Sequence, residues 1–204
     1  MMETKLARGI SYLFHPLLIP SYTLLILLNI NPFISHTIPL SYKLILAGMV
    51  LLTTFIFPLV FTWLLYHLAL VSSFFLVRKE ERTYPILAIS IFYYVSYYLL
   101  KGIHVSTIFS YYMLGATLLS ILALVVNFYF KISLHMIAAG SFTGLFLGLS
   151  LNFGINLQAE VLSAIILAGI VGYARLESNT HKPAEIYSGF ALGVIVMTLL
   201  IILL

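Results

Sequence analysis

The segment 175–185 carries the residues of this chain best suited to chemistry. Its sequence is R-L-E-S-N-T-H-K-P-A-E, so Arg175, His181 and Glu185 follow the spacing R-x5-H-x3-E. A guanidinium can hold an anionic oxygen, an imidazole can attack phosphorus, and a carboxylate can orient the imidazole. Because this polar connection lies between two apolar runs, the pattern indicates phosphate chemistry at a membrane surface.

The composition places the chain in lipid. Of its 204 residues, 62% are hydrophobic and 8% are charged, and its mean hydropathy is +1.13. A soluble domain carries about 25% charged residues, so we expect a single integral membrane domain over residues 1–204. The net charge of +4 is spread over short connections, so we interpret it as an orientation signal and expect no nucleic-acid partner.

Seven apolar runs are candidates for membrane spans, since a spanning helix needs about 20 apolar residues. They cover residues 10–30, 43–66, 84–100, 106–130, 132–152, 159–173 and 186–204. Pro16 and Pro20 break the first run. We expect a kink at Pro58, and we expect residues 67–77 either to be interfacial or to extend the second span. The sixth run is short and one residue separates the fourth from the fifth, so six spans remain open. The prediction is an all-α polytopic membrane helical bundle with six or seven transmembrane helices.

Glycine and tyrosine patterns predict how these helices pack. Gly140, Gly144 and Gly148 recur every four residues on the fifth run, and Gly189 and Gly193 do the same on the seventh. Small residues at this spacing let two helices approach closely, so we expect both stripes in helix contacts. A tyrosine cluster is interpreted as an aromatic belt, with a groove for a lipid tail as the alternative: Tyr93, Tyr94, Tyr97, Tyr98, Tyr111 and Tyr112.

The seven-span topology places three polar elements on one side of the membrane. They are residues 78–85, residues 133–135 and residues 175–185. That side carries eight of the ten cations, with only Lys43 and Lys101 opposite, so the positive-inside rule places it in the cytoplasm. We interpret Arg78, Lys131 and Lys182 as topology markers. Four other histidines match no motif and are expected to be interfacial or packed: His15, His36, His67 and His104.

The third of these elements resembles a motif of the type 2 phosphatidic acid phosphatase family, membrane relatives of the vanadium haloperoxidases. That family carries K-x6-R-P, then P-S-G-H, then S-R-x5-H-x3-D. Arg175 and His181 match the last motif at the family's spacing, with Glu185 in place of its aspartate and Ala174 in place of its serine.

The first two elements extend this resemblance to about residues 78–195. Ser133 and His135 match the second motif, with Leu134 in place of its glycine. The first motif is matched in order but not in spacing by Lys79, Arg82 and Pro85. The order of the three motifs, with an even number of spans between successive ones, is more specific than any single motif.

The resemblance implies a metal-independent phosphoric monoester hydrolase without a cofactor. His181 would attack the phosphoryl group of a lipid or isoprenoid phosphate and form a phosphohistidine, with Glu185 orienting its ring. His135 would act as general acid and then as general base. Lys79, Arg82, Arg175 and Ser133 would bind the phosphate oxygens. The expected partners are this membrane substrate and the released phosphate ion.

Two alternatives stay open beside the enzyme. Leu134, Ala174 and the longer side chain of Glu185 depart from the motifs, so a non-catalytic protein that binds or translocates a lipid phosphate is the second hypothesis. A small transporter with a chance resemblance is the third. We expect a bacterial inner membrane, where the family's bacterial members present their sites to the periplasm. The cation count favours the cytoplasm, because Lys5 and Arg8 precede the first span.

Overall fold

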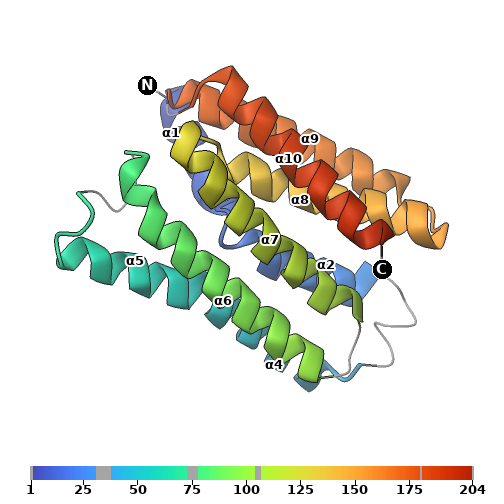
Figure 1. Ribbon diagram of the computed structural model, residues 1–204. Helices are drawn as coiled ribbons and strands as arrows, with labels where there is room; N and C mark the ends of the chain where they lie inside the picture. The colour runs from blue at the N-terminus through green and yellow to red at the C-terminus, as the bar shows by residue number, and fades with distance from the viewer. Residues whose placement is uncertain (1, 31–37, 73–77, 104–106, 180, 204) are drawn as a thin grey trace.

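The computed structural model describes residues 2–30, 38–72, 78–103, 107–179 and 181–203, which form an all-α bundle (Figure 1). The prediction of an all-α fold is therefore confirmed. Its elements, including a π-helical turn η1 and a 3-10 turn η2, are α1 (Met2–Leu13), α2 (Ile19–Ile30), α4 (Leu40–Leu51), η1 (Leu52–Ile56), α5 (Phe57–His67), η2 (Glu80–Arg82), α6 (Thr83–Gly102), α7 (Thr107–Tyr129), α8 (Leu134–Phe153), α9 (Gln158–Glu177) and α10 (Pro183–Ile202).

Within the described residues, six helical segments are long and apolar enough to cross a membrane. They are Leu40–His67, Glu80–Gly102, Thr107–Tyr129, Leu134–Phe153, Gln158–Glu177 and Pro183–Ile202. A helix of about 20 residues matches the roughly 30 Å hydrocarbon core of a bilayer. The chain is thus an integral membrane protein, in agreement with the prediction from its composition.

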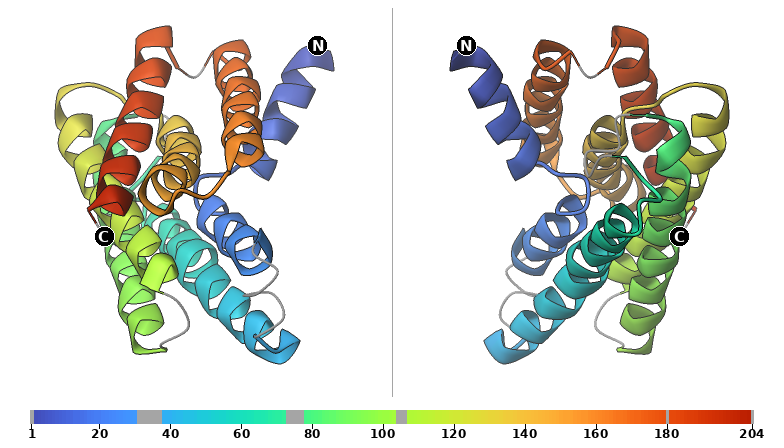
Figure 2. Two further views of the ribbon diagram at one scale, coloured as in Figure 1. Left: turned by 90° about the vertical axis from the view of Figure 1, so that its right-hand side faces the viewer. Right: turned by 90° about the vertical axis from the view of Figure 1, so that its left-hand side faces the viewer.

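The first apolar run, residues 10–30, is interrupted near the prolines as expected, but it does not form the membrane span that we counted there. It is divided into α1 and α2 by turns over residues 14–18, and Figure 2 shows α1 bent away from α2. Pro16 has no N–H and disfavours a helical His15 before it, whereas Pro20 lies in the first turn of α2, where proline is tolerated. At 12 residues, α2 is about 18 Å long and too short to cross the membrane core alone.

The second span contains the expected irregularity at Pro58 in the form of a π-helical turn. The N–H of Phe57 donates to the carbonyl of Leu52, five residues earlier. Because Pro58 has no N–H, the carbonyl of Thr54 loses its usual helical donor, and the chain widens just before the proline. α5 ends at His67, so residues 68–72 do not extend the span, and the rest of the predicted 67–77 segment lies outside the described residues.

The two glycine stripes lie in the contact between α8 and α10, as predicted. A Cβ on Gly140 would overlap the carbonyl oxygen of Phe190, and one on Gly144 would lie 2.6 Å from the carbonyl oxygen of Val194. On the facing helix, a Cβ on Gly193 would overlap the carbonyl oxygen of Ile137. The backbones are therefore in direct contact, which sets the positions of the first turns of both helices.

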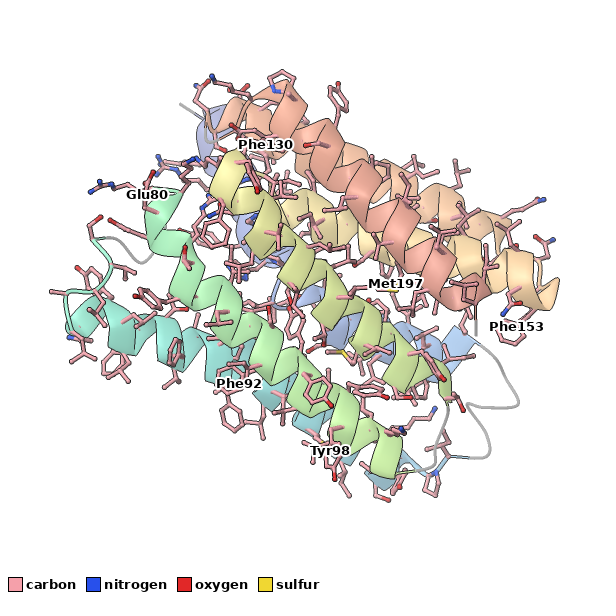
Figure 3. The ribbon with its side chains drawn as sticks, in the orientation of Figure 1. Glu80, Phe92, Tyr98, Phe130, Phe153 and Met197 are labelled. Atoms are coloured by element: carbon pink, nitrogen blue, oxygen red, sulfur yellow. The ribbon has the colours of Figure 1, made fainter. Side chains whose placement is uncertain are left out.

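The three polar elements lie at one end of the bundle. Figure 3 shows Glu80, before α6, and Phe130, after α7, at that end, and Tyr98 and Phe153 at the other. The connection between α9 and α10 and the helix α1 also lie at the first end (Figure 1), where α1 packs against α9.

Candidate functional site

His181 and Glu185 form a hydrogen-bonded pair where α10 begins. Pro183 is the first residue of α10 and Glu185 lies in its first turn, so the four-residue spacing brings the two side chains together. His181 Nδ1 lies 2.7 Å from Glu185 Oε2, and His181 is only 9% exposed. Because a carboxylate only accepts hydrogen bonds, Nδ1 carries the proton and Nε2 keeps its lone pair. Glu185 therefore lies on a helix and not on the polar connection where the sequence placed it.

The surroundings of His181 favour its neutral form. Burial lowers the pKa of His181, and the hydrogen bond that Nδ1 donates to Glu185 opposes this only in part. The positive charges of Arg175, Arg82 and Lys131 act in the same direction as burial. At neutral pH the ring is therefore a neutral imidazole, protonated on Nδ1 alone, which is the form that can act as a nucleophile.

His135 occupies the first turn of α8 and is fixed by the N-terminal helix. Its Nε2 lies 3.1 Å from the backbone carbonyl oxygen of Ser11. Since a carbonyl can only accept, Nε2 is the donor, and Nδ1 is the atom left to exchange a proton. The edge of the His15 ring packs on His135 with 5.6 Å between ring centroids. His135 is thus held in a defined tautomer and orientation.

Both histidines line one cavity of about 900 Å³. The basic side chains in its wall come from four separate parts of the chain: Arg8, Arg82, Lys131 and Arg175. The rest of the wall is largely apolar and is formed by residues of the turn after α1 and of α2, η1, α5, α6, α7 and α8, including Leu17, Phe55, Leu59, Ile86, Leu119 and Ile137. The cavity therefore joins a cationic end to a long apolar interior.

Two of the three predicted cationic ligands lie in this cavity. Arg82 is 7% exposed and donates from Nη1 to the carbonyl oxygen of Ile132 at 3.3 Å. Arg175 lies in the last turn of α9, not in the following loop, and donates from Nη1 to Ser11 Oγ at 3.3 Å. Both guanidinium groups are thus held against protein oxygens beside His181.

Lys79 and Ser133 lie away from the cavity wall. Lys79 donates from Nζ to the carbonyl oxygen of Phe128 at 3.4 Å, and its own carbonyl accepts from Asn127 Nδ2 at 2.8 Å. Lys79 therefore ties η2 to the end of α7 and does not take the phosphate-binding position predicted for it. Ser133 is fully buried, and its N–H donates to the carbonyl oxygen of Glu185 at 3.2 Å, which joins the starts of α8 and α10.

Lys131, Ser11 and His15 are among the wall residues that were not predicted as site residues. Lys131, interpreted from the sequence as a topology marker, lies just before α8 in the wall, where burial and the nearby Arg82 lower its pKa. Its position two residues before Ser133 is the signal that could have identified it. Ser11 and His15, from the end of α1 and the following turn, complete the wall. The only sequence signal near them is the pair His15-Pro16, at which the first run divides.

The other unassigned histidines do not join this site. His67 is exposed at the end of α5 and packs edge-on against Trp63, with 4.2 Å between ring centroids. His36 and His104 lie outside the described residues. In the described part of the chain, no three side chains of His, Asp or Glu are grouped so that they could hold a metal ion.

The two buried histidines make the stability of the protein sensitive to acid. Burial and the charge of Arg175 lower the pKa of His15 from 6.5 to about 4, and the pKa of His181 is also lowered. Both bind protons more weakly in the folded chain, so the unfolded chain gains protons first as the pH falls below 6.5. The folded state is favoured above that pH and loses this advantage on the way down to about 4, by roughly 3 kcal/mol for a ring whose pKa falls from 6.5 to about 4.

The change His15→Asn tests this sensitivity. His15 Nδ1 accepts from the N–H of Leu17 at 3.3 Å, and an asparagine oxygen can keep that bond without titrating. Melting temperature in detergent should fall between pH 7 and pH 4.5 for both proteins, and should fall less for His15→Asn. Equal losses for the two proteins would show that His15 contributes nothing to the acid sensitivity.

The arrangement combines a neutral imidazole with an orienting carboxylate, a second histidine and several fixed cations in one partly apolar cavity. These groups could bind a phosphate ester, transfer its phosphoryl group to nitrogen, and move a proton to the leaving oxygen. The chain matches no protein-family model, no curated protein and no solved structure.

Proposed function

We propose that this chain is a membrane phosphatase that hydrolyses a phosphomonoester of a lipid or isoprenoid, with His181 as its nucleophile. One observation carries the proposal. His181, with Nδ1 held by Glu185 and the lone pair of Nε2 free of that bond, lines the same cavity as His135, Arg82 and Arg175. The same residues gave the resemblance to the type 2 phosphatidic acid phosphatases, so motif order and spatial arrangement support one chemistry.

In the first half of the proposed reaction, the lone pair of His181 Nε2 forms a bond to phosphorus while the bond from phosphorus to the lipid oxygen breaks. The departing oxygen takes a proton from His135, which has first received that proton from the substrate, a phosphomonoester monoanion. Its Nε2–H stays on the carbonyl of Ser11, so the transferred proton comes from Nδ1. Glu185 stabilises the positive charge that develops on the His181 ring.

In the second half, His135 Nδ1 takes a proton from water as the water oxygen attacks phosphorus. The bond between phosphorus and His181 Nε2 breaks, and its electron pair returns to the ring. Phosphate takes this proton back from His135 Nδ1 and leaves as its monoanion, so both histidines recover their starting protonation. Throughout, Arg82, Arg175 and Lys131 would balance the charge on the non-bridging oxygens, which is the main task of a protein in phosphoryl transfer.

The apolar part of the cavity supports a substrate with a hydrocarbon tail. It extends from the cationic end past Ile86 and Leu119 to Tyr93 and Tyr112, both of which are buried. A tail in this space would be removed from water while its phosphate stays among the cations. This favours a lipid or isoprenoid phosphate over a small soluble ester. It also supports the groove interpretation for two of the six tyrosines, whereas Tyr94 and Tyr98 are exposed.

Phosphate release by the purified protein in detergent tests the proposal. Wild type should release phosphate from a long-chain isoprenyl monophosphate, and much more slowly from glycerol phosphate, which has no tail. EDTA should leave the rate unchanged, because the proposed mechanism uses only side chains. Orthovanadate should inhibit, because its five-coordinate form imitates the transition state. Release that is abolished by EDTA, or equal rates for both substrates, would contradict the proposal.

Leu134 favours the second candidate function, a protein that binds or translocates lipid phosphate without hydrolysing it. Its side chain lines the cavity at the position where the related motif has glycine, and it therefore occupies space next to His135. Wild type that binds the isoprenyl phosphate, measured as a rise in melting temperature, but releases no phosphate would establish this function in place of the enzyme.

A further inference from the structure

Ser11, in the last turn of α1, touches two of the groups proposed to act on phosphate. Its backbone carbonyl accepts from His135 Nε2 at 3.1 Å, and its Oγ accepts from Arg175 Nη1 at 3.3 Å. Ser11 is 8% exposed. These partners lie 124 and 164 residues further along the chain, so Ser11 joins α1 to the starts of two otherwise separate functional elements.

The hydroxyl of Ser11 is itself oriented. It donates its hydrogen to the carbonyl oxygen of Ala7 at 2.9 Å, and this leaves only lone pairs for Arg175. A hydroxyl that already donates its hydrogen can act only as an acceptor toward other groups. Hydrogen bonds to charged groups are stronger than those between neutral groups. Ala7 is 3% exposed, and α1 packs against α9. The position of Ser11 therefore depends on the docking of the whole N-terminal helix.

We infer that Ser11 is a positioning residue of this site, and that α1 completes the site. The carbonyl fixes the tautomer of His135, so that Nδ1 is its proton-exchanging atom, and the hydroxyl fixes the direction of the Arg175 guanidinium. This role rests on the proposed phosphatase function. The effects of the carbonyl on His135 and of the hydroxyl on Arg175 can be tested separately, because a substitution at Ser11 removes the hydroxyl and leaves the carbonyl in place.

Three variants at the end of α1 test the hydroxyl. Ser11→Ala removes the acceptor for Arg175, Ser11→Thr restores a hydroxyl, and Gly9→Ala is the matched control, because a Cβ on Gly9 would meet nothing within 4 Å. For Ser11→Ala we expect the KM for isoprenyl monophosphate and the inhibition constant for orthovanadate to rise about tenfold, as for the loss of a charge-assisted hydrogen bond. The pH profile of kcat should stay that of wild type, since the carbonyl still holds His135. Ser11→Thr should recover most of the affinity.

The carbonyl is tested by moving the helix. Ala7→Leu places a larger side chain at a buried position of α1 and should displace Ser11 from both partners. We expect kcat to fall and its pH profile to shift, because His135 then loses its fixed tautomer, in addition to the rise in KM. Melting temperatures of all variants show whether the proteins remain folded at the assay temperature.

The outcomes separate this inference from the proposed function. If wild type hydrolyses the substrate while Ser11→Ala keeps the wild-type KM and vanadate inhibition, the positioning role is wrong and the phosphatase stands. A loss in Ser11→Ala that follows its melting temperature and is not recovered in Ser11→Thr also overturns the role, since it would mean only a packing defect. If wild type neither releases phosphate nor binds orthovanadate, the proposed function fails and the role of Ser11 fails with it.

Discussion

Replacing His181 with alanine should reduce phosphate release by about 10⁴-fold or more, the size of effect seen when a covalent nucleophile is removed. The physical reason is that no other group in the described cavity combines a free ring nitrogen with an orienting carboxylate. The change also removes the hydrogen-bond partner of Glu185 and should cost about 1–3 kcal/mol of stability, so the melting temperature is measured beside the rate. The measurement is the rate of phosphate release from isoprenyl monophosphate at pH 7.

A matched control and a trapping experiment complete this test. His67→Ala removes an exposed histidine at the end of α5 that takes no part in the cavity and should keep the wild-type rate. Brief reaction with radiolabelled substrate, followed by denaturation, should leave acid-labile phosphate on wild type and on His67→Ala, and none on His181→Ala. A His181→Ala protein that still turns over at more than a few per cent of the wild-type rate would exclude His181 as nucleophile.

Replacing Gly140 with alanine should destabilise the bundle by about 3 kcal/mol, the upper end of the range for overpacking. The added Cβ would overlap the carbonyl oxygen of Phe190 and approach Gly193 Cα. These are backbone atoms of a rigid helix and cannot rotate away, so α8 and α10 must separate. The measurement is the melting temperature in detergent. Gly169→Ala in α9 is the control, since a Cβ there would meet nothing within 4 Å.

The same change should lower activity beyond its effect on stability. α8 carries His135 and α10 carries Glu185, and their starts are joined by the hydrogen bond from the N–H of Ser133 to the carbonyl of Glu185. Separating the helices moves one histidine relative to the other, and displacements of about 1 Å are enough to reduce a rate about 100-fold. If Gly140→Ala has the same melting temperature as Gly169→Ala and keeps the wild-type rate, the close contact is dispensable.

The features that the sequence predicted well depend on local patterns. Long apolar runs specify membrane helices because the backbone has no other partner in lipid, and five of the seven expected runs correspond to single helices with similar bounds. The glycine stripes likewise predicted close helix contacts, since their four-residue period places them on one helix face, and the structure shows that the two helices contact each other. The main error was to count the first run as a membrane span, because the break expected at its prolines leaves α2 only 12 residues long.

Part of the site was predicted because it, too, depends on local sequence patterns. His181 and Glu185 are four residues apart, so their hydrogen bond follows from local geometry. Ser11 and Lys131 could not be assigned in this way, because their roles come from contacts with distant segments that no spacing encodes. Lys79 was assigned from motif order alone, and its contacts with Phe128 and Asn127 show that a cation in the right order can instead cap a neighbouring helix.

The π-helical turn before Pro58 determines which residues of α5 line the cavity. Such a turn carries one residue more than an α-helical turn, and each residue rotates a helix by about 100°. Phe55 in this turn and Leu59 and Thr62 after it all line the cavity. If the chain lacked that one additional residue, every later position of α5 would rotate away by this angle, and the face that now meets the cavity would meet lipid instead. The register of an entire wall is thus set by a single insertion.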